Sequence, residues 1–237
     1  MRILPALLLP LADGVSGMAS AQGVHGPGLS VEAMSDYRER GLSWSRGSPT
    51  VALSALLPVA GGIDIMGTAV GLRGSRRADG ADVGVTLGAR YSGRGVVRPS
   101  GGVAMRLFPG RSALTYWEVD ARADYDLGPA TLGGGIVYAP AQDAIGGDAL
   151  YVEAGAGVAI PARPIRFSAA MGHSSGGGGI TRLRPQGRYT DWRLGVDYLR
   201  GPFVVGLRYT DTFMGEGGGQ ADPHGGGRLS AFLRWDL

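Results

Sequence analysis

Apolar and polar residues alternate along most of the chain from residue 28 to its end. In residues 81–91 every second side chain is apolar, and residues 117–125, 150–160 and 229–237 repeat the pattern. A period of two is typical of a β-strand with two different faces, and helical periodicity is hard to find here. The sequence therefore predicts an all-β protein. About twelve strands are expected, near residues 28–44, 49–59, 62–73, 80–91, 95–108, 114–126, 129–139, 148–160, 163–173, 188–199, 202–213 and 227–237.

The connections between these strands fall into two classes. The connections after even-numbered strands are tight, at residues 60–61, 92–94, 127–128, 161–162 and 200–201. Those after odd-numbered strands are longer, at residues 74–79, 109–113, 140–147, 174–187 and 214–226, except that the first is only a few residues around Arg46. This alternation predicts an up-and-down antiparallel meander with one short-turn rim and one long-loop rim.

Strand length and the placement of aromatic residues favour a membrane barrel over a soluble sheet. About ten residues at ~3.3 Å each, tilted by ~40°, span roughly the 25 Å apolar band of an outer-membrane barrel. Soluble strands are typically shorter, at about five or six residues. Aromatic residues tend to lie near the predicted strand ends, as interface girdles do. These are Tyr37, Tyr91, Trp117, Tyr125, Tyr138, Tyr151, Trp192, Tyr198, Tyr209 and Trp235.

A transmembrane antiparallel β-barrel with periplasmic termini fixes the two faces of each strand. An arginine facing lipid at mid-depth costs about 2–4 kcal/mol, so the polar faces are expected to line the lumen. Their charges either brace the wall as salt-bridged pairs or line a weakly selective aqueous pore, and both roles can hold together. The candidate lumen-lining residues are Glu32, Asp36, Arg38, Arg40, Asp82, Arg90, Arg106, Glu118, Asp120, Arg122, Asp124, Glu153, Arg166, Asp191, Arg193, Asp197, Arg208 and Arg234.

The N-terminal segment has the features of a secretory signal peptide. Arg2 is followed by an apolar stretch over residues 3–12, and Ala19-Ser20-Ala21 fits the small-residue cleavage rule. Residues 1–21 are therefore expected to direct export, which leaves residues 22–237 as the barrel domain.

Composition narrows the function classes. The 237 residues include 44 glycines, no cysteine and no lysine, and the net charge is +3. The lack of cysteine excludes disulfides, iron–sulfur clusters and cysteine nucleophiles. The small and dispersed positive charge does not favour nucleic acid as a partner. Much of the glycine is expected at the rims and on the lumen wall, where it leaves volume. No cofactor and no metal site are expected.

Several short motifs resemble those of the TorF-type porin family of outer-membrane barrels. Residues 35–43, Ser-Asp-Tyr-Arg-Glu-Arg-Gly-Leu-Ser, resemble the opening signature of that family, and Pro49 follows. The likeness continues at residues 107–110, 117–118, 138–140, 189–191 and 209–212. The resemblance implies an outer-membrane barrel with pore activity. Glu39 replaces the usual aromatic residue, which places Glu39 on an outward position near the rim. Leu237 replaces the terminal aromatic residue common in such barrels.

Other motifs raise the question of enzymatic activity. Residues 172–176 match the G-x-S-x-G nucleophile elbow, but the glycines that follow do not favour the helix that the elbow requires. His173 and Ser175 resemble the catalytic pair of outer-membrane acyl hydrolases, although no carboxylate or amide is in place to orient the imidazole. Asp222 and His224 lie in a glycine-rich loop, where they could contact a divalent ion.

The sequence thus predicts a non-enzymatic, porin-like outer-membrane channel for passive diffusion of small hydrophilic solutes or ions. The alternatives are a narrow or plugged barrel with a structural or rim-binding role, and an acyl hydrolase acting on lipid. The expected partners are the barrel-assembly machinery, small solutes, outer-membrane lipids and lipopolysaccharide. The arginines of residues 73–77 are candidates to attract lipopolysaccharide phosphates, unless they lie in a solvated loop.

Overall fold

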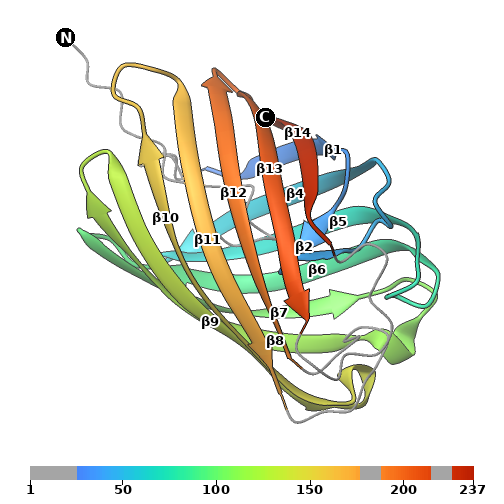
Figure 1. The fold of residues 1–237 in the computed structure, drawn as a ribbon. Helices are drawn as coiled ribbons and strands as arrows, with labels where there is room; N and C mark the ends of the chain where they lie inside the picture. Colours follow the sequence, from blue (N-terminus) through green and yellow to red (C-terminus); the bar gives the residue numbers. More distant parts are fainter. Residues whose placement is uncertain (1–25, 177–187, 215–225) are drawn as a thin grey trace.

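Twelve long antiparallel strands form a closed barrel in the computed structural model, which describes residues 26–176, 188–214 and 226–237 (Figure 1). The barrel strands are β1 (Gly28–Met34), β4 (Thr50–Ala60), β5 (Ile63–Ser75), β6 (Ala81–Ser92), β7 (Val97–Leu107), β8 (Tyr116–Leu127), β9 (Ala130–Gln142), β10 (Gly147–Ala159), β11 (Ile165–Ser175), β12 (Tyr189–Arg200), β13 (Phe203–Met214) and β14 (Arg228–Asp236). A separate two-stranded sheet consists of β2 (Arg38–Glu39) and β3 (Leu42–Ser43). The predicted all-β barrel fold is confirmed.

Each barrel strand pairs with its neighbours along the chain, and the first and last strands close the sheet. β1 pairs with β14, with Glu32 opposite Arg234, and with β4, with Met34 opposite Thr50. Closure leaves no unpaired edge for another chain to join. The described helices are two 3-10 turns, η1 (Ser112–Leu114) and η2 (Asp143–Ile145). Neither they nor any other described segment forms a helix long and apolar enough to span a membrane.

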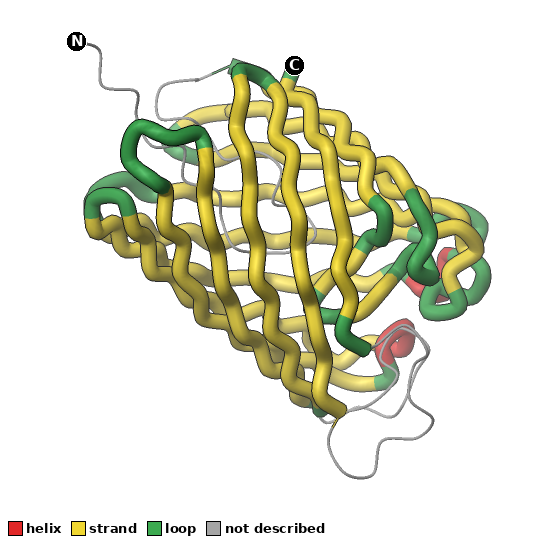
Figure 2. The backbone as a smooth tube through the Cα atoms, turned by 45° about the horizontal axis from the view of Figure 1, so that its top comes forward, coloured by secondary structure: helices red, strands yellow, loops and turns green. Residues whose placement is uncertain are grey.

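The two rims differ in the length of their connections. Short turns such as the one between β12 and β13 lie at one end, where the Leu237 amide donates to the Leu29 carbonyl (2.8 Å). Both 3-10 turns lie at the opposite end, with the longer connections (Figure 2). These are the short-turn rim and the long-loop rim. Short and long connections alternate along the chain, which agrees with the predicted meander.

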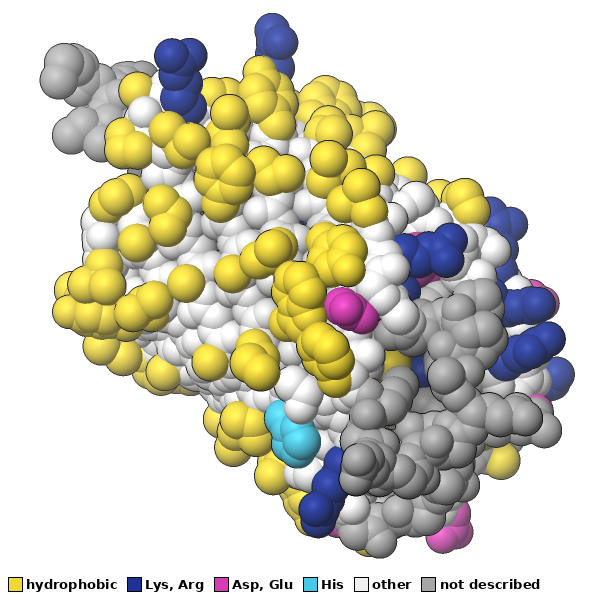
Figure 3. Space-filling view, in the orientation of Figure 1, with side chains coloured by type: hydrophobic (Ala, Val, Ile, Leu, Met, Phe, Trp, Pro, Cys, Tyr) yellow, Lys and Arg dark blue, Asp and Glu magenta, His cyan; other side chains and the backbone are white. Residues whose placement is uncertain are grey.

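The two faces of the wall have opposite character. Large apolar side chains such as Leu53, Ile136 and Val205 alternate along the strands and are about half exposed, at 47%, 48% and 51%. They cover the outer surface in Figure 3. The intervening residues point to the interior, and many of them are buried and charged, for example Arg122 and Arg193. A water-soluble protein instead buries its large apolar residues and keeps its charged residues exposed.

The first predicted strand is wrong beyond Met34. The predicted strand covers residues 28–44, but β1 ends at Met34, and the chain leaves the wall after Ser35, which exchanges hydrogen bonds with Ala231 of β14. Residues 35–48 then form an inward hairpin that contains β2 and β3 and lies inside the barrel (Figure 1). The first connection at the long-loop rim is therefore long, not a few residues around Arg46.

Candidate functional site

The inward hairpin (residues 35–48) has a two-residue turn at its tip. Glu39 pairs with Leu42, and the turn residues Arg40 and Gly41 both have positive φ, at 48° and 79°. Two consecutive residues with φ > 0 characterise the type I′ turn, whose twist matches that of a β-hairpin. Glycine adopts this conformation without steric cost, whereas arginine does so at some cost in energy. Contacts of the Arg40 side chain therefore hold it in a conformation that arginine rarely adopts.

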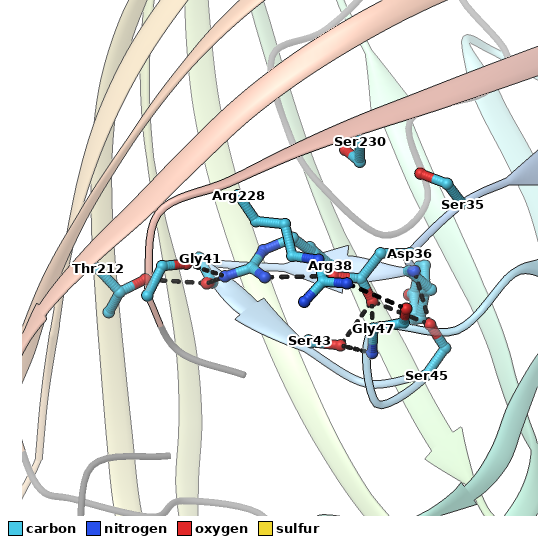
Figure 4. A network of polar contacts seen from close by, with 12 residues as sticks. Ser35, Asp36, Arg38, Gly41, Ser43, Ser45, Gly47, Thr212, Arg228 and Ser230 are labelled. Carbon is cyan, nitrogen blue, oxygen red and sulfur yellow. Dashed lines mark hydrogen bonds and ion pairs between the residues drawn. The ribbon is translucent and has the colours of Figure 1, made fainter. Parts of the chain in front are cut away.

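A polar network organised by Asp36 holds the base of the hairpin together (Figure 4). Asp36 Oδ1 accepts hydrogen bonds from Ser43 Oγ (2.6 Å), Ser45 Oγ (3.0 Å) and the Gly47 amide (3.2 Å). Arg38 Nη1 lies 3.2 Å from Asp36 Oδ2. Because these groups are buried, each missing partner would leave a polar atom unsatisfied. The hairpin thus carries its own internal support.

An apolar face of the hairpin packs against the interior near the long-loop rim. The Trp44 ring stacks on Phe108, with ring centroids 6.1 Å apart and an interplanar angle of 9°. Tyr37 and Trp44 belong to one buried cluster with Leu72 of β5 and Ile145 of η2. Such packed aromatic contacts fix the position of the hairpin below the rim.

Ion pairs attach the hairpin tip to β7 and β8. Glu39 accepts two hydrogen bonds from the Arg106 guanidinium. Glu118 accepts hydrogen bonds from Arg106 (Nε 3.1 Å, Nη2 2.9 Å) and from Arg40 Nη2, at 2.8 and 2.9 Å. Burial lowers the pKa of the Arg40 guanidinium, but the Glu118 and Glu39 carboxylates outweigh burial and raise that pKa above its ordinary value. The tip cluster, made up of Glu39, Arg40, Arg106 and Glu118, therefore contains two paired positive and two paired negative charges.

The other side of the tip contacts β12 and β13. The Gly41 carbonyl accepts a hydrogen bond from Thr212 Oγ1 (2.8 Å), as Figure 4 shows, and another from Arg38 Nη2 (2.7 Å). A Cβ added at Gly41 would lie 2.4 Å from Asp191 Cβ and 2.5 Å from Thr212 Oγ1. Only glycine fits this contact. Because β7 and β12 are five strands apart in a barrel of twelve, the tip touches nearly opposite walls.

A small cavity lies beside the tip. Its volume is about 60 Å³, and Arg40, Tyr116, Glu118, Tyr151 and Tyr189 are among the residues that line it. The Arg40 guanidinium carbon lies 5.4 Å from the centroid of the Tyr151 ring, and the Tyr151 hydroxyl donates to Asp191 Oδ1 (3.1 Å). At roughly 10–15 Å³ per water, the cavity has room for a few water molecules.

Ion pairs between strands continue along the interior toward the short-turn rim. Glu153 of β10 lies between Arg122 of β8 and Arg193 of β12, and it is hydrogen-bonded to both. Arg90 lies 3.0 Å from Asp120. Further pairs join Arg98 to Asp126 and Arg234 to Asp236, each at 3.0 Å. Most of these side chains come from different strands, so the pairs connect the wall across the sheet.

The structure places most of the candidate lumen residues on the inner face of the wall. These are Glu32, Arg90, Arg106, Glu118, Asp120, Arg122, Asp124, Glu153, Arg166, Asp191, Arg193, Asp197, Arg208 and Arg234. Arg208 stacks on Phe232, with its guanidinium carbon 4.4 Å from the ring centroid. Asp82 is exposed near the long-loop rim. Asp36, Arg38 and Arg40 lie on the inward hairpin instead of the wall strand on which they were predicted.

Several residues of the site were missed or misplaced by the sequence reasoning. Glu39 was expected to point outward near the rim, yet it is buried inside, bound to Arg106. Tyr37 and Tyr151 were assigned to aromatic girdles, but both are buried in the interior. The Arg40-Gly41 pair, with a glycine suited to a tight turn, is the signal that could have revealed the hairpin.

The motifs considered for catalysis lie in different environments. Ser174 is a buried inward residue of β11, which continues to Ser175, so the chain makes no strand-to-helix turn at this serine. His173 points outward, and its Nδ1 is 2.9 Å from the Thr190 hydroxyl. Asp222 and His224 lie outside the described residues, as does the predicted signal peptide.

The arginines of residues 73–77 do not share one environment. Arg73 and Arg76 are exposed, and Arg73 Nε donates to the Pro49 carbonyl (3.0 Å). Arg77 is buried and lines the cavity beside the hairpin tip. Arg77 therefore departs from the expectation that the arginines of this segment lie together in a rim loop, where they would attract lipopolysaccharide phosphates or simply be solvated.

Comparison with known proteins supports the barrel fold. The structure is similar to the NanC porin (TM-score 0.60, 11% identity, covering 87% of this chain and 97% of that one). It is also similar to the KdgM porin (TM-score 0.56, 8% identity, 88% and 98% covered). These likenesses support a porin-type barrel, as the resemblance to TorF-type porins implied, but they do not support that family name. No curated protein matches the sequence. A family model does match residues 18–218, so the chain belongs to Gcw_chp, a family of bacterial proteins of unknown function.

Proposed function

We propose that the protein is an outer-membrane channel through which small hydrophilic solutes diffuse passively. The observation that carries this proposal is the inversion of the wall, with large apolar side chains outside and charged side chains inside. Lipid stabilises such an outer face, and water or polar solutes stabilise such an interior. The likeness to two porin structures supports the same conclusion at the level of the fold.

The orientation follows from the two rims. In outer-membrane barrels the short turns face the periplasm and the longer loops face outward. Leu237 lies at the short-turn rim, which supports a periplasmic location for this residue. An N-terminal signal peptide over residues 1–21 would supply the export step, and the barrel-assembly machinery would insert the chain.

The interior charges indicate weak charge selectivity. The candidate lumen residues on the inner wall comprise seven arginines and seven carboxylates. Paired charges cancel at a distance, so they brace the wall while leaving only a small net field along the path. The mechanism is diffusion, in which lumen charges set the local potential felt by an ion and no bond is made or broken.

Single-channel recording tests this proposal. The refolded protein is first shown to be a barrel by its heat-modifiable migration on a gel, and is then added to planar bilayers. Discrete conductance steps with a small reversal potential in a salt gradient are expected, and heat-unfolded protein serves as the control. Absence of steps from folded protein would contradict the channel proposal and favour a structural barrel.

A further inference from the structure

We infer that the inward hairpin (residues 35–48) sets the size limit of the solutes that cross this barrel. The inference rests on the proposed channel function and identifies the element that determines its selectivity. Among the described residues, the hairpin leaves the wall and enters the path, and its tip contacts both sides of the lumen.

The contacts on the two walls make the hairpin a crossing element. On one side, Glu39 and Arg40 bind Arg106 of β7 and Glu118 of β8. On the other side, Gly41 lies against Asp191 of β12 and Thr212 of β13. A loop that merely lined the barrel would contact adjacent strands only. This hairpin spans nearly opposite strands and divides the interior at its level.

Little space remains where the tip crosses. The cavity between the hairpin and the wall from β8 to β12, about 60 Å³ in volume, has room for only a few water molecules, and it is lined by large side chains such as Trp44 and Tyr116. Toward the short-turn rim the inner wall carries Gly133, Gly155 and Gly195 among its ion-paired arginines and carboxylates. The hairpin tip therefore leaves a narrow space between itself and the wall from β8 to β12.

The barrel does not need the hairpin in order to close. Met34 and Thr50 are already paired in the β1–β4 ladder, so a short turn could join the two strands directly. Residues 36–48 are an insertion between strands that are paired without them. The ion pairs of the tip instead hold it in the path and offset the unfavourable backbone conformation of Arg40.

Liposome swelling with sugars of graded size tests the inference. In the hairpin-less variant, an Asn-Gly turn replaces residues 36–48 and keeps the β1–β4 register. Folding of wild type and variant is checked by heat-modifiable migration before reconstitution. We expect the wild type to admit a monosaccharide slowly or not at all, and the variant to admit di- and tetrasaccharides severalfold faster than the wild type.

The outcomes separate the inference from the channel proposal. Larger sugars entering through the variant than through the wild type support the inference, and ion conductance of the wild type supports the channel proposal. The same size limit for folded wild type and variant overturns the inference and leaves the channel proposal intact. No permeation through either folded barrel contradicts the channel proposal, and it also overturns the role of the hairpin because removing the hairpin opens nothing.

A point variant keeps the inference testable if the hairpin-less chain does not fold. Gly41→Ala places a Cβ against Asp191 and Thr212 at a residue with φ of 79°. Its matched control is Gly201→Ala, at a turn residue with φ of 59° and no neighbouring atom within 4 Å. We expect Gly41→Ala to raise sugar permeation severalfold and the control to behave as wild type. Equal permeation by the two variants would overturn the inference.

Discussion

Glu118 is the residue whose change should release the hairpin tip most directly. Its carboxylate accepts four hydrogen bonds, at 2.8–3.1 Å, from Arg40 on the hairpin and Arg106 on the wall. Glu118→Gln removes the charge and keeps a single acceptor oxygen. Breaking a buried ion pair by removing one partner costs about 3–5 kcal/mol. Because Glu39 still pairs with Arg106 in this variant, we expect a cost near the lower end of this range. About 3 kcal/mol changes an equilibrium constant by roughly a hundredfold.

The assay for this change is the reactivity of a cysteine placed on the hairpin. The chain has no cysteine, so Leu42→Cys introduces one buried thiol beside the tip. We expect Glu118→Gln to increase the rate of maleimide labelling of Cys at this position by up to about a hundredfold. Asp126→Asn, which breaks an interior ion pair with Arg98 near the other rim, is the matched control and should leave the rate unchanged. Equal labelling rates in the two variants would refute the role of the tip cluster.

Three further predictions concern the hairpin, the outer face and the inner wall. In the Leu42→Cys protein, Trp44→Ala removes the stack on Phe108 and should also increase the rate of maleimide labelling, whereas Trp117→Ala on the outer face should not. An unchanged labelling rate with Trp44→Ala would show that packing does not hold the hairpin. Ile136→Arg, at the middle of β9 on the outer face, should lower the free energy of unfolding in lipid vesicles by about 2–4 kcal/mol, and Val59→Arg, on the outer face near the short-turn rim, by about 0–1 kcal/mol. A soluble, fully stable Ile136→Arg protein would contradict the outward lipid contact. Arg208→Glu on the inner wall should shift the reversal potential in a salt gradient toward cation selectivity, and an unchanged potential would exclude Arg208 from the path.

The wall of the barrel was predictable because a two-residue period encodes which side each residue faces. Strands such as β8 and β10 differ from their predicted bounds by only one or two residues, since turn residues such as Gly128 mark their ends. The inner-wall charges were found for the same reason, because an alternation of Glu118, Asp120 and Arg122 with apolar residues leaves one arrangement that lipid tolerates.

The hairpin was not predictable by the same rule. Asp36, Arg38 and Arg40 continue the alternation of polar and other residues that begins at Ser30 and Glu32, so the pattern indicates one long strand. Inside a barrel, however, both faces of a hairpin contact protein, and the alternation no longer separates lipid from lumen. The buried position of Glu39 follows from its pairing with Arg106, a contact between residues 67 positions apart that the local pattern does not encode.

Single-channel recording of the wild type beside the hairpin-less variant tests most directly whether the inward hairpin restricts a diffusion channel. Folding of both proteins is first confirmed by heat-modifiable migration. Small, weakly selective conductance steps are expected for the wild type, and clearly larger steps for the variant. A folded wild type that gives no steps would contradict the channel proposal, and steps of equal size from wild type and variant would contradict the role of the hairpin.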